Sequence, residues 1–161
     1  MNLKKLHIIF ALALILSACQ TRRADSLYNY KTNYVGDNSK VSHIISNQDY
    51  PKDFEVGAIE ILSRKSPYGI KVFVKDTSNI KREDIFKNAI TSFALIKNLD
   101  RIYYMESGRD FEEEKSKELN DKIFIFYRKE IEEILEEKNT SLEEISDNKE
   151  NFENFINNWD K

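Results

Sequence analysis

The sequence predicts an α+β fold, a single small domain in which an antiparallel or mixed sheet of about four strands packs with three to four helices. Short apolar runs with strand-like alternation occur along the chain, and segments with apolar residues at helical spacing separate them. No internal repeat and no low-complexity tract divides the 161 residues, so strands and helices are expected to share one core. The predicted order of elements is α-β-β-α-β-β-α-α.

The N-terminus has the three parts of an export signal. Lys4 and Lys5 give a positive start, residues 6–16 form an almost wholly apolar run, and two small residues precede the expected cleavage site. The apolar run is shorter than the roughly 20 residues that a helix needs to cross the hydrocarbon core of a bilayer. We therefore expect residues 1–18 to be a cleaved signal peptide and not a membrane span.

The cleavage site carries the segment Leu16-Ser17-Ala18-Cys19, which resembles the lipobox of bacterial lipoproteins. The resemblance implies that the Cys19 sulfur receives a diacylglycerol and that fatty chains such as palmitate then anchor the protein to membrane lipid, on the extracytoplasmic face of the cell membrane. Two or more chains are needed, because one chain, at about 0.8 kcal/mol per buried methylene, binds only marginally. The alternatives are an ordinary small apolar residue of the signal and a free thiol, since Cys19 is the only cysteine and no internal disulfide can form.

Residues 20–33 are polar and lack a sustained apolar period, so we predict a lipidated tether over residues 19–33 and a folded domain over residues 34–161. A fully extended tether of about fourteen residues would reach roughly 45 to 50 Å, enough to lift the domain off the membrane. The chain is mildly acidic, with a formal net charge of −3. No basic stripe offers contacts to phosphates, so no nucleic acid partner is expected.

The domain is predicted to begin with a short helix, which Asp37 or Asn38 can cap and which should end before Pro51. Its apolar face consists of Val41, Ile44 and Ile45. Two strands follow over residues 56–62 and 69–75, and the turn residues between them predict a hairpin. In the second strand, Ile70, Val72 and Val74 alternate with Lys71, Phe73 and Lys75.

The widest apolar stripe of the chain predicts one helix over residues 82–99, with Phe86 and Phe93 directed at the sheet. A strand is expected at residues 101–105. Residues 106–122 are almost entirely polar and predict an exposed loop or a solvated helical turn. The run Ile123-Phe124-Ile125-Phe126 is apolar on both faces, which favours a short buried strand.

Two helices are predicted after this strand. The first covers residues 128–138 and stops at Asn139. The second begins at Thr140 or Ser141, with Glu143 or Glu144 three positions on to complete a capping box. Asp147 and Asn148 are residues that can interrupt it. Its apolar side consists of Leu142, Ile145, Phe152, Phe155, Ile156 and Trp159.

Residues 34–41 (YVGDNSKV), 67–70 (PYGI) and 93–96 (FALI) together resemble domain-of-unknown-function family 4825. The resemblance covers most of residues 30–160, and residues 35–39 are its most specific part. It implies an uncharacterised extracytoplasmic domain of anchored envelope proteins of low-GC Gram-positive type. Domains of this family are sometimes attached to membrane peptidases of the antibiotic-sensor kind, and no reaction is assigned to them.

Few residues of the sequence are candidates for catalysis or metal binding. His43 is the only histidine after the signal, so a zinc site is not expected, and no cofactor is implied. The ordinary role of His43 is that of a satisfied or exposed helix residue; a hydrolase site formed by Asp37, Ser39 and His43 is the alternative. The glutamates at residues 112–114 and 130–137 interleave with lysines as a solvated surface does, and no calcium-binding loop pattern occurs.

Small and polar residues gather directly before the first helix, at Gly36, Asp37, Asn38 and Ser39. Two interpretations stand for this segment. In the first it is a plain helix cap, in which Gly36 supplies an unusual backbone angle and Asp37 or Asn38 accepts the first amide hydrogens. In the second the free amides of the helix N-terminus bind an anionic ligand.

Phosphate-loop and serine-elbow motifs are absent from the sequence. We therefore expect a non-catalytic binding or sensing module of the cell envelope, with an envelope protein as a candidate partner. A role in stress or antibiotic sensing would be one form of this function.

Overall fold

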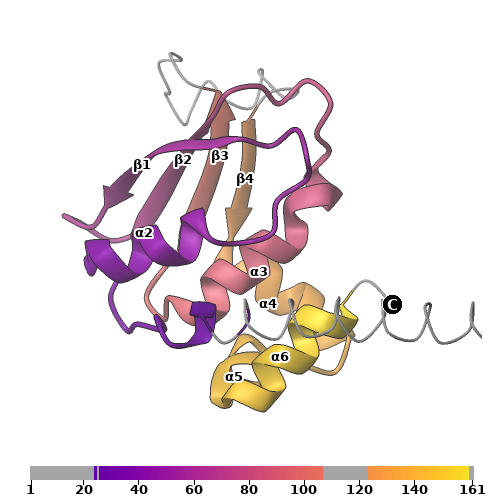
Figure 1. The fold of residues 1–161 in the computed structure, drawn as a ribbon. Helices are drawn as coiled ribbons and strands as arrows, with labels where there is room; N and C mark the ends of the chain where they lie inside the picture. The colour runs from indigo at the N-terminus through magenta and orange to yellow at the C-terminus, as the bar shows by residue number, and fades with distance from the viewer. Residues whose placement is uncertain (1–23, 25, 107–122, 160–161) are drawn as a thin grey trace, which may run out of the picture.

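The computed structural model describes residues 24, 26–106 and 123–159 (Figure 1). The predicted signal peptide, the lipobox with Cys19 and the acidic run at residues 112–114 lie outside the described residues. Within the described ranges, no helix has both the length and the apolar character needed to cross a membrane. The fold is a single α+β domain with a four-stranded mixed sheet, so the predicted class is confirmed.

The sheet has the strand order β1-β2-β3-β4, with β1 at Val56–Leu62, β2 at Gly69–Val74, β3 at Arg101–Glu106 and β4 at Ile123–Tyr127. The β1–β2 and β3–β4 pairs are antiparallel, which confirms the predicted hairpin. The central β2–β3 pair is parallel. A parallel pair needs a crossover connection, and the segment between β2 and β3 supplies it with helical structure.

One face of the sheet belongs to the core. The strand register brings Ile61, Ile70, Ile102 and Phe126 side by side in one row across all four strands. Ile70, Val72 and Val74 are fully buried, as the alternation in β2 predicted. Helices α2 (Asn38–Ser46) and α3 (Phe86–Leu95) lie across this face (Figure 1). Three further helices gather at one end of the sheet: α4 (Arg128–Glu137), α5 (Leu142–Asp147) and α6 (Lys149–Asn158).

The crossover helix is shorter than the sequence predicted. Residues 82–85 form a 3-10 turn, η1 (Arg82–Ile85), and α3 ends at Leu95 and not at residue 99. The reason is a contact from a distant part of the chain. Thr32 forms a parallel bridge with Ile96, and the Lys97 amide donates to the Thr32 carbonyl at 3.0 Å. Ile96 is therefore held in an extended conformation that no helix can continue through.

The C-terminal helices follow the predicted signals. Helix α4 (Arg128–Glu137) stops before Asn139, which has a positive φ of 56°. Helix α5 (Leu142–Asp147) is capped by Ser141, whose hydroxyl accepts from the Glu144 amide at 3.0 Å. Asn148 ends α5 in an extended conformation and caps α6 (Lys149–Asn158), so the suspected interruption is a true break.

The domain begins earlier than the predicted boundary at residue 34. Ala24 and Leu27 are buried in the core, and the Tyr28 ring lies 5.8 Å from the Phe152 ring. The Tyr28 hydroxyl also donates to the Asp147 carbonyl at 3.1 Å. Residues 26–33 are thus part of the folded domain and not of a tether. Their few apolar positions are too scattered to give a periodic signal, yet Tyr28 meets a partner from the far end of the chain.

Tyr104 lies at the centre of the core, where its ring meets Tyr50, Phe54 and Phe126 edge-on. Burial raises the pKa of Tyr104 well above its ordinary value, because the phenolate would lose its hydration. Burial raises the pKa of Tyr50 in the same way, and the Tyr50 hydroxyl donates to the Ile45 carbonyl at 3.0 Å.

The position of Leu27 predicts the effect of truncating it. Leu27→Ala should lower the free energy of unfolding by about 2 to 4 kcal/mol, because the side chain is 2 % exposed and a cavity would remain. Asn29→Ala, in an exposed position two residues further on, is the control and should change it by less than about 0.5 kcal/mol. Urea denaturation measures both values. Equal effects would mean that residues 26–33 are a tether after all.

The buried tyrosine predicts a loss of stability in alkali. A group whose pKa is raised on folding stabilises the protein below its unfolded pKa, and this contribution is lost as the pH rises further. The free energy of unfolding should therefore fall from about pH 10 upward. Tyr104→Phe should make this fall shallower, whereas Tyr34→Phe, at a side chain that is 69 % exposed, should not. Urea denaturation at a series of pH values between about 8 and 11 tests the difference.

Candidate functional site

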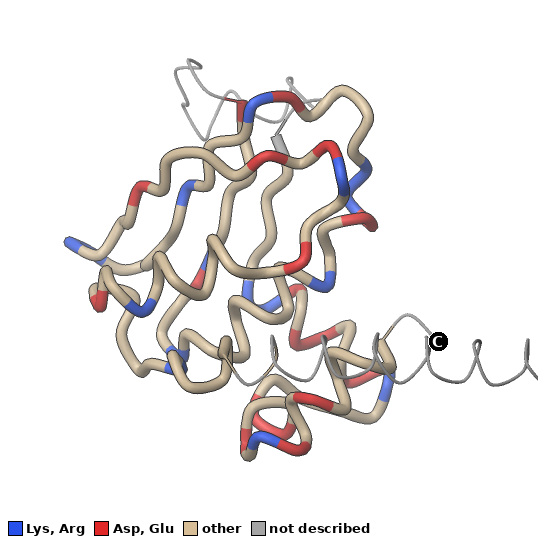
Figure 2. Tube along the Cα trace, viewed as in Figure 1, with Lys and Arg blue, Asp and Glu red and all other residues tan. Residues whose placement is uncertain are grey.

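A groove with polar walls and an apolar floor lies between α3, α4 and α5. We call it the α3–α5 groove; its volume is about 580 Å³. Its floor is formed by Phe93, Ala94 and Leu142, and it includes the end of the N-terminal segment at Lys31. Figure 2 shows basic and acidic residues interspersed along the chain at this end of the fold.

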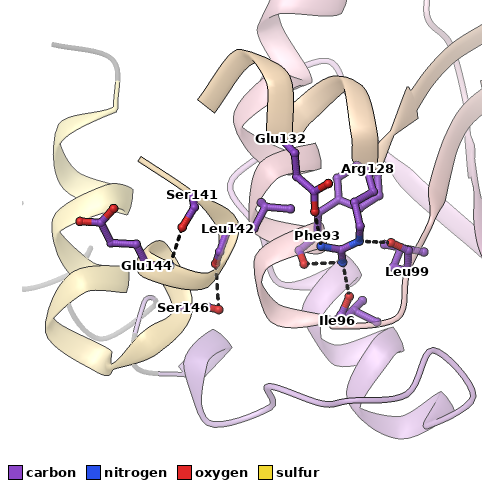
Figure 3. Close-up of polar contacts among 9 residues, drawn as sticks. All are labelled: Phe93, Ile96, Leu99, Arg128, Glu132, Ser141, Leu142, Glu144 and Ser146. Atoms are coloured by element: carbon purple, nitrogen blue, oxygen red, sulfur yellow. Dashed lines mark hydrogen bonds and ion pairs between the residues drawn. The ribbon is translucent and has the colours of Figure 1, made fainter. Parts of the chain in front are cut away.

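Arg128 connects α4 to the C-terminal end of α3 beneath the groove. It is the first residue of α4, and its amide donates to the Asp100 carbonyl at 2.8 Å, which fixes the helix start beside β3. Its guanidinium donates to the carbonyls of Phe93, Ile96 and Leu99 at 2.9, 2.9 and 2.7 Å (Figure 3). These carbonyls belong to the C-terminal end of α3 and the turn after it, where helical partners are missing.

The guanidinium group of Arg128 is largely shielded from the solvent. Burial lowers the pKa of Arg128, and the Glu132 carboxylate, 3.5 Å from Nη1, opposes this shift. A guanidinium does not lose its proton in proteins, so Arg128 stays a cation. Because its N–H groups face three carbonyls and one carboxylate, Arg128 acts as a clamp on α3 and has little left to offer a ligand.

The serine hydroxyl groups of the groove also form hydrogen bonds within the fold. Ser141 caps α5, and the Ser146 hydroxyl donates to the Leu142 carbonyl at 3.0 Å (Figure 3). The Lys31 ammonium donates to the Ser146 carbonyl, which joins the N-terminal segment to α5. A serine nucleophile needs an adjacent base, and the groove lining contains no imidazole.

Three charged side chains that line the groove are exposed to solvent. Lys97 lies on one wall, and Glu136 and Glu143 lie on the helices opposite, α4 and α5. All three residues are exposed. Glu143 also interacts electrostatically with Arg128. The groove thus presents exposed carboxylates from α4 and α5, and the ammonium of Lys97, above an apolar floor.

The segment singled out in the sequence, Gly36 to Ser39, lies elsewhere, at the start of α2. Asp37 is the N-cap, and its carboxylate accepts from the Lys40 amide at 3.3 Å. That carboxylate occupies the place where an anion would meet the helix amides. Asn38 is the first residue of the helix, and Ser39 is exposed. Gly36 does not have a left-handed φ, so the expectation of an unusual backbone angle is wrong.

His43 has contacts other than those of the suggested hydrolase site. Its ring stacks on Tyr30 with centroids 3.5 Å apart, and its Nε2 lies 3.2 Å from the Ser26 hydroxyl. The side-chain partner of Asp37 is Lys40, at 3.7 Å, and not the imidazole. His43 therefore joins the N-terminal segment to α2. Among the described residues, no group of histidine, cysteine and carboxylate side chains converges as a metal site would require.

The glutamates of α4 behave as the sequence suggested. Glu133 pairs with Lys129 at 3.7 Å on the solvent side, and Glu130 pairs with Arg82. Sequence reasoning nevertheless missed the groove. One local pattern could have indicated the role of Arg128. It directly follows an apolar strand, against which an arginine can bury its aliphatic stem. The pairing of Lys31 with Ser146 has no local signal, because the two residues lie far apart in the chain.

Comparison with known proteins gives one match. The family described as Domain of unknown function (DUF4825) matches residues 27–119. The match begins at Leu27, inside the N-terminal segment that the structure places in the fold. No curated protein and no solved structure matches the chain.

The hydrogen bonds of Arg128 predict a large loss of stability when its side chain is removed. Arg128→Ala should lower the free energy of unfolding by about 2 to 4 kcal/mol, since three carbonyls lose a charged donor. Arg128→Lys should recover only part of this, because an ammonium lacks the planar fork that reaches all three. Lys129→Ala, at a side chain that is 89 % exposed, is the control and should cost less than about 0.5 kcal/mol. Chemical denaturation measures all three, and equal costs at residues 128 and 129 would contradict the clamp.

Proposed function

The chain belongs to the family described as Domain of unknown function (DUF4825), and from this premise we propose that it is a lipid-anchored, non-catalytic binding domain on the extracytoplasmic face of a bacterial cell membrane. Its binding site is the α3–α5 groove. Its partner is an envelope protein that presents a basic segment to this groove.

The proposal is supported by a difference among the polar groups of the groove: some hold the helices together, and others are exposed to solvent. Arg128, Ser141 and Ser146 are engaged in holding α3 and α5. Glu136 and Glu143 place exposed carboxylates above the apolar floor. Lysine and arginine side chains suit such a surface, because their aliphatic stems can cover the floor while their charged ends reach the carboxylates.

The anchor is the second part of the proposal and rests on the lipobox at residues 16–19. Because Ala24 is already buried in the fold, only residues 20–23 separate Cys19 from the domain. Fully extended, the span from Cys19 to Ala24 covers roughly 17 Å, far less than the predicted tether. The domain would then be held close to the bilayer, and its partner would be a membrane protein or a protein bound nearby.

Reversing the exposed acidic charges of the groove tests the binding site. The double substitution Glu136→Lys and Glu143→Lys should weaken binding of an extended lysine-rich hexapeptide by at least about tenfold, because two attractive contacts become repulsive. The control, Glu137→Lys with Glu150→Lys, changes the net charge equally at exposed positions outside the groove. Calorimetric titration at low ionic strength measures both. Equal weakening in the two double variants would show that only net charge matters and would overturn the site.

Removing the sulfur of Cys19 tests the anchor. Cys19→Ser should abolish acylation and signal cleavage, so that the mature, membrane-bound form disappears. Labelling of cells with a radioactive fatty acid, followed by membrane fractionation, measures both changes. Ser17→Thr is a control that keeps the cysteine. An unaltered mature form on the membrane in Cys19→Ser would rule out lipid anchoring and would leave the groove untouched.

A further inference from the structure

A second groove lies between α5 and α6, and we call it the α5–α6 groove. Its volume is about 300 Å³, at the lower end of the range of small-molecule sites. None of the residues that line it also lines the α3–α5 groove. Glu144 is one of its residues, and Figure 3 shows this side chain pointing away from Arg128. The two grooves therefore lie on different sides of α5.

The floor of the α5–α6 groove is apolar. Ile145 of α5 and Phe155 of α6 are buried, and the half-buried indole of Trp159 lies beside Phe155, with the two ring centroids 5.4 Å apart. The Lys138 ammonium lies over the Trp159 ring, 5.3 Å from its centroid, but Lys138 does not line the groove. The part of the indole that lines the groove is thus not the part that Lys138 covers.

Carboxamide side chains form the α6 side of this groove. Asn151, Asn154 and Asn158 are three and four residues apart, so they share one face of the helix. The Asn151 side-chain nitrogen donates to the Glu144 carbonyl at 3.0 Å, which fixes this amide against α5. Its side-chain oxygen has no partner among the described residues, and it is accessible to solvent. Asn154 is exposed. Amide donors and acceptors are therefore within reach of a ligand above the floor.

The α5 side of the groove adds a hydroxyl and a carboxylate. The Thr140 hydroxyl donates to the Glu144 carboxylate, with Oγ1 and Oε2 3.2 Å apart. The Thr140 oxygen can still accept, and so can the carboxylate. Glu144 is the one charged residue of the lining. A ligand with several charges would therefore lack counter-charges here, whereas a neutral ligand that both donates and accepts hydrogen bonds suits the groove.

We propose that the α5–α6 groove is a binding site for a saccharide, which it holds by one pyranose ring. A sugar hydroxyl both donates and accepts, so neighbouring hydroxyls can pair with the amides of Asn151 and Asn154 and with Thr140. The C–H groups on one face of the ring match the apolar floor and the Trp159 indole. The proposal depends neither on the lipid anchor nor on the partner of the α3–α5 groove.

Trp159 is the only tryptophan of the chain, so its fluorescence reports on this groove directly. Titration of the full chain with glucose and with N-acetylglucosamine, in buffer free of sugar-based detergents, should change the emission saturably. We expect a Kd of about 1 to 10 mM for at least one of the two sugars. Glycerol carries hydroxyls without a ring face and should give a linear response over the same concentrations.

A pyranose ring occurs as a free sugar and as a unit of a glycan chain, and the β-1,4-linked trimer of N-acetylglucosamine separates these sources. Equal affinity for monomer and trimer means that one ring suffices, and tighter binding of the trimer means that the groove recognises a chain. A linear response to every sugar would overturn the proposal. Saturation by glycerol, or by a blocked trialanine peptide at lower concentrations than the sugars, would also overturn it.

Variants check that the signal comes from the groove. Asn154→Ala removes one exposed amide and should weaken binding about fivefold, the loss expected for one hydrogen bond. Asn154→Arg places a longer side chain across the groove and should weaken binding by more than about tenfold. Asn79→Ala removes an exposed amide outside the groove and should bind as the unchanged chain does. Circular dichroism identifies the folded variants, and undiminished binding in a folded residue 154 variant would overturn the proposal.

Discussion

The parallel pairing of β2 with β3 is the constraint on which the rest of the fold depends. Two parallel neighbours cannot be joined by a tight turn, so residues 75–100 must leave the sheet, cross it and return. The helical part of this crossover, α3, is thereby laid on the core face of the sheet. Eight of its ten residues are buried, which few helices on a small domain achieve.

A helix that is buried on almost all sides needs partners for its polar groups, and two pockets beside α3 arise from that need. At the C-terminal end of α3, Arg128 donates to the carbonyls that the helix leaves unpaired. In the middle of α3, Asn88 and Ser92 pair with groups at the end of α2, including Gln48. The α3–α5 groove follows from the first arrangement, and a small cavity lined by Gln48, Asn88 and Thr91 follows from the second.

The N-terminal segment connects these features. It bridges to the residue after α3 through Thr32, pairs with α5 through Lys31 and contacts α6 through Tyr28. The segment that would lead to the lipid is therefore also the segment that borders both pockets. If the chain is anchored as we propose, a pull on the tether acts directly on Leu27, which lines the small cavity beside Gln48.

The sequence by itself determined the elements whose signals are local. The hairpin, the caps at Asp37 and Ser141 and the stop at Asn139 all depend on residues a few positions apart, so pattern and propensity suffice to predict them. The tertiary structure alone decided where α3 ends, where the domain begins and which side chains meet in the two pockets beside α3. Each of these depends on contacts such as that of Thr32 with Ile96 or Lys31 with Ser146, between residues that no local pattern relates. Long-range pairing overrides helical propensity because a buried backbone group must find a partner, and only the folded chain shows which one is within reach.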